Sequence, residues 1–150
     1  MNSVEKKKYC VYGEWRESKT TKWMDVTDSS TGEVIAQVPN CTQEEVLEAI
    51  DSAAAAFPSW SMESLSKRTQ MLFKWRNILV AHEEELTYLC AKELGKTLNE
   101  ARGDVLKAIE PTELACAAPF LTQGNASLQV TNGFDTASYR VPLGVVAGIV

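Results

Sequence analysis

The chain has 150 residues, of which 45% are hydrophobic and 23% are charged, and its formal net charge is −5. One domain's length with this composition is typical of a folded globular protein and excludes a disordered chain. The acidic balance argues against a nucleic-acid surface, and no apolar stretch approaches the roughly 18 residues of a membrane span or forms the core of a signal peptide.

The four cysteines are scattered along the chain without a C-x-x-C pair. In a chain without an export signal we interpret them as reduced thiols of a cytoplasmic protein. No group of His, Cys, Asp and Glu has the spacing of metal ligands, so we expect no metal site. The cysteines are Cys10, Cys41, Cys90 and Cys116.

Short apolar runs separated by turn residues predict β-hairpins over the first forty residues. The candidate strands are residues 9–12, 23–26 and 34–38, the first of them followed by a hairpin partner that begins at Trp15. Pro39 is expected to end the last strand, because proline has no N–H to donate to a ladder.

A capping box predicts the start of the first helix. Thr42 and Glu45 form the T-x-x-E pattern, in which the hydroxyl accepts the N–H of residue 45 and the carboxylate accepts that of residue 42. Apolar residues follow at helical spacing until Pro58, which we expect to close the segment.

Three further helices are predicted after this one. The second begins near Ser64, and the third spans about residues 82–94, with three glutamates in its first turn and Gly95 as its end. In the fourth we expect a kink or a restart at Pro111, because proline removes one helical hydrogen bond. Gly124 ends the stretch.

The last part of the chain is strand-like. Residues 127–141 form two candidate strands around the Asn132-Gly133 turn, and residues 145–150 form an unbroken apolar run. Such a run is typical of a strand buried in a parallel sheet, which needs neighbouring strands for its backbone groups. Either earlier strands of the chain supply these neighbours, or the chain is the front portion of a longer polypeptide.

In this order the elements resemble the N-terminal part of an aldehyde dehydrogenase. Within that superfamily, the stretches at residues 113–119 and 138–144 resemble the CoA-acylating methylmalonate-semialdehyde (malonate-semialdehyde) dehydrogenases. The stretches that carry the superfamily resemblance are YGEWRES at 12–18, TGEVIAQVPNCTQEEVLEAIDSAAAAFPSW at 31–60, KELGKTLNEARGDV at 92–105 and YRVPLGVVAGIV at 139–150.

The resemblance implies an α/β fold with β-hairpins, about four helices and the start of a Rossmann-like parallel sheet. It assigns residues 1–126 to hairpins and helices of the NAD-binding domain, and 127–143 to a strand pair of the oligomerisation sheet. Residues 144–150 are then the first, truncated strand of the NAD-binding sheet.

The resemblance also implies the chemistry of the parent enzyme. Such enzymes oxidise a semialdehyde with NAD through a cysteine thioester, which CoA then releases as acyl-CoA. The nucleophile, the general base and most of the cofactor site come later in the family's sequence, so we expect the 150 residues alone to be inactive. We expect the full-length form to be a homo-oligomer, a dimer or a tetramer.

Two residues are candidate binding residues on the basis of the resemblance. The backbone of Val150 is expected beside the nicotinamide end of NAD. Lys107 stands where the semialdehyde branch has an arginine that holds the distal carboxylate of the substrate, although a lysine pairs as a point charge and not as a fork. A solvated lysine on a helix is the competing interpretation.

Other reactive residues are assigned structural roles. None of the four cysteines matches a nucleophile motif, so we predict no catalytic residue in this chain. We expect His82 to be exposed, Asp104 to make a structural polar contact and Arg140 to form a salt bridge.

Two alternatives stay open for the function. One is a hydrolytic aldehyde or succinate-semialdehyde dehydrogenase, using NAD or NADP, which transfers the acyl group to water. The other is a non-catalytic oligomerisation module that pairs through its open strand edges. Dependence of turnover on CoA separates the first alternative from the main hypothesis.

Overall fold

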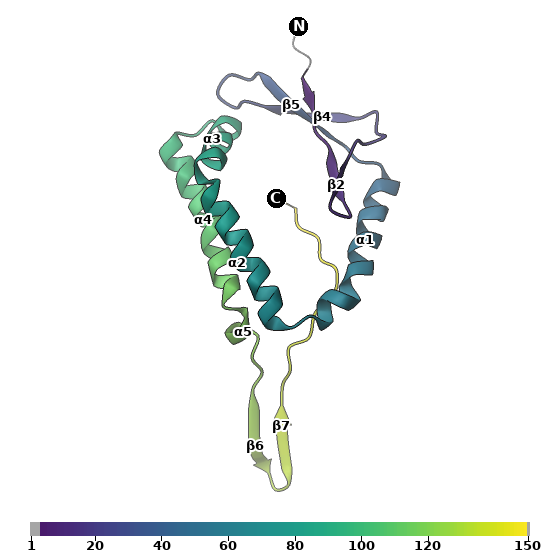
Figure 1. Cartoon of the computed structure of the whole chain (residues 1–150), viewed down its shortest axis with the longest axis vertical. Helices are drawn as coiled ribbons and strands as arrows, with labels where there is room; N and C mark the ends of the chain where they lie inside the picture. Colours follow the sequence, from purple (N-terminus) through teal and green to yellow (C-terminus); the bar gives the residue numbers. More distant parts are fainter. Residues whose placement is uncertain (1–3, 150) are drawn as a thin grey trace.

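A computed structural model of the chain describes residues 4–149. In Figure 1 the elements form a ring, with small sheets at one end, α1 on one side and the α2–α4 helices on the other. A hairpin of β6 and β7 projects from the opposite end, and the C-terminal segment turns back into the ring. The elements are β1 (Glu5–Lys6), β2 (Tyr9–Val11), β3 (Glu14–Arg16), β4 (Trp23–Thr27), β5 (Val34–Pro39), α1 (Gln43–Met62), α2 (Leu65–Ala81), α3 (Glu83–Leu94), α4 (Leu98–Cys116), α5 (Ala118–Leu121), β6 (Ala126–Thr131) and β7 (Phe134–Ala137).

The N-terminal strands form two small sheets. β5 lies in the middle of the larger one, antiparallel to β4 and parallel to the short β1, while β2 and β3 form a separate hairpin. The predicted hairpins are confirmed, and β5 ends at Pro39 as expected. The turn between β4 and β5 closes the ring, because the Ser29 hydroxyl donates to the carbonyl of Glu93 near the end of α3.

α1 begins with the predicted capping box. Glu45 N–H donates to Thr42 Oγ1 at 3.3 Å, and Thr42 N–H donates to Glu45 Oε2 at 2.8 Å. The prediction that Pro58 closes the helix is wrong, since α1 continues to Met62. One proline costs a helix a single backbone hydrogen bond and a local distortion, and the turns on both sides persist here.

The next helices begin and end where the sequence predicts. Ser64 caps α2, accepting the N–H of Lys67 at 3.3 Å. Gly95 ends α3 in the left-handed conformation, with φ of 66°. Its Cα faces the β4–β5 turn so closely that an added Cβ would lie 3.2 Å from the Cβ of Ser29.

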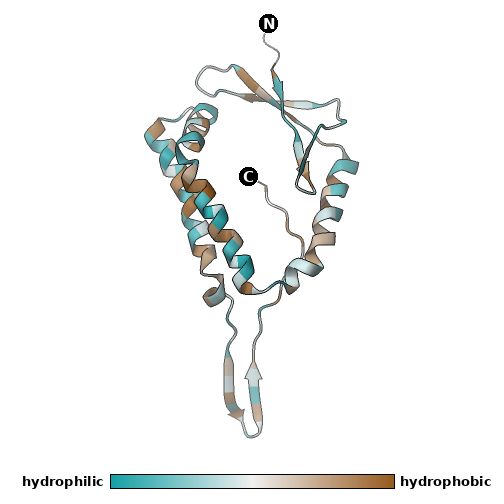
Figure 2. Ribbon diagram, in the orientation of Figure 1, coloured by the Kyte–Doolittle hydropathy of each residue, from teal (hydrophilic) through white to brown (hydrophobic). Residues whose placement is uncertain are grey.

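α4 carries most of the small core. Its buried apolar residues are Ala101, Val105, Ile109 and Cys116, and they recur at helical spacing along one face. No restart occurs at Pro111, because the helix runs through it to Cys116. Figure 2 shows hydrophobic stretches along α2 and α4, which lie side by side and pack against one another.

The end of the described chain packs against little. Every residue of β6 and β7 is exposed. At the base of this hairpin a Cβ on Gly124 would collide with the carbonyl oxygen of Ser138, so the close approach of the two segments requires glycine. Residues 144–149, predicted to be a buried strand, are in no strand of the described chain, and their assignment to an NAD-binding sheet stays a prediction.

Candidate functional site

α4 carries the residue predicted to bind substrate. Lys107 lies on this helix, exposed, and its ammonium group forms no ion pair or hydrogen bond within residues 4–149. One turn earlier, Asp104 accepts a hydrogen bond from the ammonium of Lys96 at 2.5 Å. The structural polar contact predicted for Asp104 is therefore confirmed.

A thiol completes the polar cluster at the junction of α3 and α4. Cys90 Sγ lies 4.0 Å from Asp104 Oδ2, the same oxygen that Lys96 contacts. The Lys96 ammonium holds the pKa of Asp104 below its usual range, and Lys107 acts in the same direction more weakly. A carboxylate already held by a lysine is a poor proton acceptor, so this cluster joins two helices and does not activate the thiol.

The remaining cysteines do not form a nucleophilic site in the described chain. Cys10 is exposed, Cys41 is half-buried and Cys116 is buried in the core. Burial raises the pKa of the Cys41 thiol, and the nearby carboxylate of Glu45 raises it further. A raised pKa lowers the thiolate fraction at neutral pH, which is the reverse of what a nucleophile requires.

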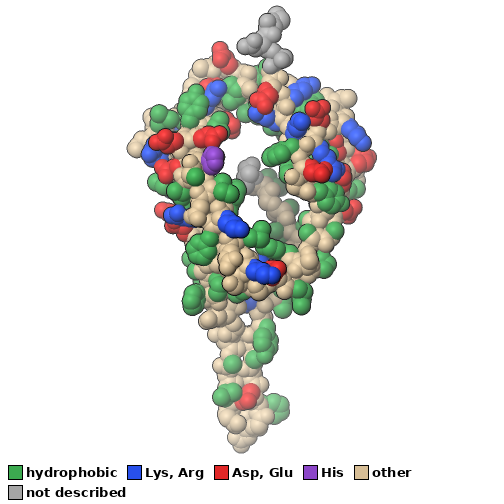
Figure 3. Space-filling view, in the orientation of Figure 1, with side chains coloured by type: hydrophobic (Ala, Val, Ile, Leu, Met, Phe, Trp, Pro, Cys, Tyr) green, Lys and Arg blue, Asp and Glu red, His purple; other side chains and the backbone are tan. Residues whose placement is uncertain are grey.

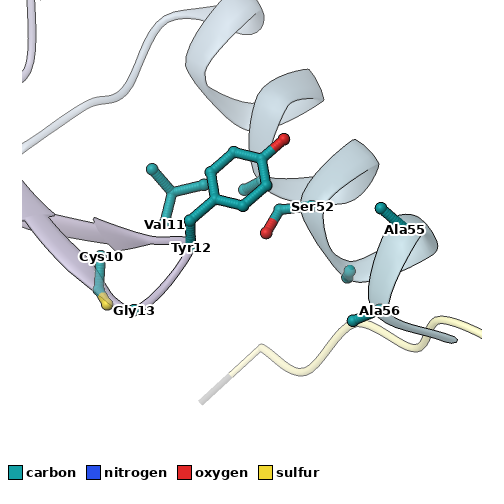
Figure 4. Close-up of a pocket in the computed structure, with 9 residues that line it drawn as sticks. Cys10, Val11, Tyr12, Gly13, Ser52, Ala55 and Ala56 are labelled. Atoms are coloured by element: carbon teal, nitrogen blue, oxygen red, sulfur yellow. The ribbon is translucent and has the colours of Figure 1, made fainter. Parts of the chain in front are cut away.

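A hollow of about 610 Å³ lies between the β2–β3 hairpin and α1. Figure 4 shows Tyr12 reaching from the hairpin turn over the helix, whose Ser52, Ala55 and Ala56 face the opening. No carboxylate, imidazole or amine lines this hollow, and its ionisable groups are the Cys10 thiol and the Tyr12 phenol.

The prediction for His82 is confirmed, whereas the one for Arg140 is not. His82 is exposed as expected, and its Nδ1 lies 2.9 Å from a carboxylate oxygen of Glu85 one turn along α3. Arg140 is also exposed, but within residues 4–149 it forms no ion pair, so the predicted salt bridge is not found there.

Two capping and anchoring contacts were not predicted. Thr97 and Glu100 form a second capping box at the start of α4, with Thr97 Oγ1 donating to Glu100 Oε2 at 2.7 Å. The T-x-x-E spacing in TLNE was a signal that could have revealed it. Glu45 also accepts from Ser18 Oγ at 2.7 Å and from Lys19 N at 2.8 Å, a link between loop and helix that spacing does not encode.

The residues present do not form an NAD site. Val150, the predicted cofactor contact, lies outside the described residues, and the segment before it belongs to no sheet within residues 4–149. Val146 and Ile149 of this segment are 79% and 100% exposed. A nucleotide-binding crevice lies at the ends of several paired strands, so we derive no step of hydride transfer from this chain.

In Figure 3 the ring is hollowed at its centre, and hydrophobic and charged side chains both border the opening.

Within the described residues, no group of three or more His, Cys, Asp and Glu side chains could hold a metal ion. None of the described helices has the length and apolar character needed to cross a membrane.

Comparison with known proteins agrees with the resemblance. The family model described as "Aldehyde dehydrogenase family" matches residues 15–150. A malonate-semialdehyde dehydrogenase from Listeria monocytogenes serotype 4a is 43% identical over 149 residues, which cover 99% of this chain and 30% of that protein. Malonate-semialdehyde dehydrogenase 2 of Bacillus cereus is 45% identical over 139 residues, covering 93% of this chain and 28% of that protein.

Solved structures share the fold. The crystal structure of a methylmalonate-semialdehyde dehydrogenase from Oceanimonas doudoroffii superposes with a TM-score of 0.86 at 30% identity, covering 93% of this chain and 28% of that one. A structure from Sinorhizobium meliloti 1021, complexed with NAD, has a TM-score of 0.88 at 24% identity and covers 96% of this chain and 29% of that one. At that identity the second comparison shows the fold alone.

The chain spans about 30% of the length of the curated relatives it matches. The predicted fold class is confirmed, because the mixed α/β arrangement matches the N-terminal part of the aldehyde dehydrogenase fold. A family match over residues 15–150, together with identity above 40% across nearly the whole chain, means that this chain belongs to the aldehyde dehydrogenase family.

Proposed function

We propose that the chain is the N-terminal part of an NAD-dependent, CoA-acylating (methyl)malonate-semialdehyde dehydrogenase. The observation that carries this proposal is the 43% identity to a malonate-semialdehyde dehydrogenase over 149 residues. The family membership and the structural neighbour that was complexed with NAD support NAD as the cofactor. CoA as the acyl acceptor rests on the resemblance of residues 113–119 and 138–144.

In this proposal the 150 residues are scaffold for a reaction that other residues perform. We assign no catalytic role to the cysteines of residues 4–149, and the segment leading to Val150 joins no sheet of the described chain. Alone, the chain is inactive. We place the full protein in the cytoplasm as a homo-oligomer, because the cysteines are free thiols and the projecting β6–β7 hairpin offers unpaired edges.

Lys107 is the residue of this chain that we assign to substrate binding. Its ammonium group is exposed and unpaired within the described residues, so it is free to meet the distal carboxylate of a semialdehyde acid. Asp104, one turn away, is neutralised by Lys96 and leaves the lysine charge available. A lysine offers a single point charge, so an arginine at this position binds a carboxylate with better-defined geometry.

A chimera tests the proposal. Residues 1–150 of this chain are joined to the rest of the Bacillus cereus relative, and NADH and acyl-CoA formation are measured with malonate semialdehyde. We expect turnover that requires CoA in the chimera and none in the isolated chain. NAD reduction by the isolated chain contradicts the proposed inactivity, and a folded chimera that turns over without CoA supports the hydrolytic alternative.

The role of Lys107 is read from variants of the same chimera. Lys107→Met is expected to raise KM for malonate semialdehyde about tenfold, as expected for the loss of one charged contact, and to leave KM for an uncharged aldehyde unchanged. Lys107→Arg is expected to restore or lower the KM for the acid. Equal effects on charged and uncharged aldehydes contradict the assignment.

The exposed hairpin favours a second candidate, the non-catalytic oligomerisation module. β6 and β7 pair only with each other within the described chain, so each strand has one edge without a partner strand. Unpaired strand edges are templates for pairing with another chain. If this is the function, the tagged 150-residue chain co-purifies with a full-length aldehyde dehydrogenase of its source. A chain that stays monomeric in the presence of that enzyme argues against this candidate.

A further inference from the structure

The arginines of the chain fall into two groups according to their partners. Arg16, Arg76 and Arg102 each lie within 3.6 Å of a glutamate carboxylate. The guanidinium groups of Arg68 and Arg140 form no ion pair or hydrogen bond within residues 4–149, and both line the same pocket. The arginines that lack partners are therefore not scattered but meet at one place.

This pocket, which we call the arginine pocket, lies where three segments meet. The start of α2 forms one side, the residue after α5 a second, and the chain that follows β7 the third. Its volume is about 340 Å³, which lies within the range of about 300–1,000 Å³ found for small-ligand sites. The lining residues are Leu65, Arg68, Thr122, Arg140, Val141 and Pro142.

No acidic side chain lines the arginine pocket. The carboxylate nearest in sequence is that of Glu63, which is already engaged: it accepts the N–H of Ser64 at 2.8 Å and contacts Lys67 Nζ at 3.3 Å. Glu63 lines a separate hollow beside Trp60. The two guanidinium charges are thus left without a counter-charge from this part of the chain.

Arg68 has a hydrogen-bond donor without an acceptor. Its Nε is buried and has no hydrogen-bond partner within the described residues. A buried donor without an acceptor is costly, more so when the group is charged, and cationic groups that share a pocket repel each other. An anion between the two arginines would offset the repulsion between the two guanidinium groups.

The backbone at the start of α2 adds to the positive potential of the pocket. Leu65 is the first residue of α2, a helix of 17 residues, and the N-terminal end of a helix carries partial positive charge. The Thr122 hydroxyl is not available as a donor to the anion, because it donates to the carbonyl of Ala118 at 2.6 Å.

We propose that the arginine pocket binds a small oxyanion, a carboxylate or phosphate group, between Arg68 and Arg140. A guanidinium presents parallel N–H donors that match the oxygens of either group. The anion is either free in solution or a carboxylate side chain from a further part of the polypeptide. The site is separate from Lys107 and does not depend on the proposed dehydrogenase activity.

The test uses inorganic phosphate as the probe. Calorimetric titration of the 150-residue chain with phosphate, at constant ionic strength set with chloride, is expected to show saturable binding. Arg68→Gln and Arg140→Gln are each expected to weaken it about tenfold or more, as for the loss of a hydrogen bond to a charged group. The matched control is Arg102→Gln, which removes the same charge from an arginine that pairs with Glu83, and leaves binding unchanged.

The design remains decisive if one variant folds poorly. Arg140 is exposed, so its replacement leaves the fold intact, and Arg68→Lys keeps the charge of the half-buried position while removing the fork. Absence of saturable phosphate binding, or equal weakening by Arg102→Gln, overturns the proposal.

The same titration in the chimera separates the two sources of the anion. Retained phosphate binding identifies a site for a free anion. Binding that is present in the isolated chain but blocked in the chimera, together with a larger fall in Tm for Arg68→Gln and Arg140→Gln than for Arg102→Gln, identifies a carboxylate of the polypeptide as the occupant.

Discussion

The helices α2–α4 and the β6–β7 hairpin are both rich in apolar side chains, yet only the helices bury any of theirs. Ile109 on α4 is 5% exposed, whereas Leu128 on β6 is 76% exposed. The helices are neighbours in sequence, so they pack against one another within the described chain. The hairpin is paired only with itself, and a lone two-stranded hairpin has no second layer to cover its faces.

The contrast separates two kinds of stability in one polypeptide. The helical part depends on contacts that its own residues provide, so mutations in its core should lower the free energy of unfolding. The hairpin is stabilised by hydrogen bonds between its own two strands and at its base, and its apolar side chains are available to another surface.

The largest effect is expected in the helical core. Ile109→Ala should lower the free energy of unfolding by about 2–5 kcal/mol, because it removes buried methyl groups and leaves a cavity. Leu128→Ala should change it by less than about 0.5 kcal/mol, because that side chain is already exposed. Urea unfolding followed by circular dichroism measures both, and equal effects would show that the hairpin packs against the helices in solution.

Two glycines that look equivalent in sequence should respond in opposite directions. Gly95→Ala should destabilise the chain by about 1–2 kcal/mol, since its positive φ disfavours a Cβ and the Ser29 side chain lies close. Gly103→Ala, inside α4 with open space around it, should stabilise by about 0.5–1 kcal/mol. Thermal unfolding of the two variants gives the signs, and a stabilising Gly95→Ala would place the β4–β5 turn away from α3.

Acid should weaken the link between α1 and the preceding loop. Hydrogen bonds from Lys19 N–H and the Ser18 hydroxyl hold the pKa of Glu45 below its ordinary value of 4.5. Because the folded-state pKa is lowered, Glu45 stabilises the fold above about pH 4.5, and this contribution is lost as the pH falls through the lowered value.

Glu45→Gln removes the group that titrates. The stability difference between wild type and Glu45→Gln, measured by urea unfolding, should therefore be largest near neutral pH and shrink in acid. Glu84→Gln is the control, because Glu84 is exposed and its carboxylate forms no hydrogen bond or ion pair within residues 4–149. A difference that stays constant with pH would contradict the assigned cause of the lowered pKa.

The smallest effect on stability, and the clearest on association, is expected in the hairpin. The double variant Leu128→Lys and Phe134→Lys should change the free energy of unfolding by less than about 1 kcal/mol, because both side chains are exposed. It should reduce self-association and hydrophobic-dye binding. The control, Thr136→Lys, adds charge to the same hairpin without removing a large apolar side chain. If it reduces self-association and dye binding equally, the effect is due to charge alone.

Local features of the fold were predictable from spacing. The capping box at Thr42 and Glu45, the start of α2 after Ser64 and the end of α3 at Gly95 each depend on residues within about four positions. Pro58 and Pro111 show the limit of such reasoning. A proline weakens a helix by a known amount, yet both helices continue through it.

The candidate sites were less predictable than the fold. Placing Lys107 on a helix followed from the sequence, and its substrate role remains a prediction that the resemblance supplies. The arginine pocket had no signal in the sequence, because Arg68, Thr122 and Arg140 are far apart along the chain and meet only through the path of the backbone. A structural contact of Asp104 was predicted, but its partners Lys96 and Cys90 were not.

The sequence by itself therefore determined the family, the order of the elements and the ends of most helices, since these follow from periodicity, caps and similarity over short stretches. Only the tertiary structure decided which charges are paired and which apolar faces are covered. Arg76 meets Glu113 across 37 residues, while Arg140 meets no carboxylate within the described chain. Pairing at that range depends on where the backbone carries each side chain, and residue spacing does not encode that path.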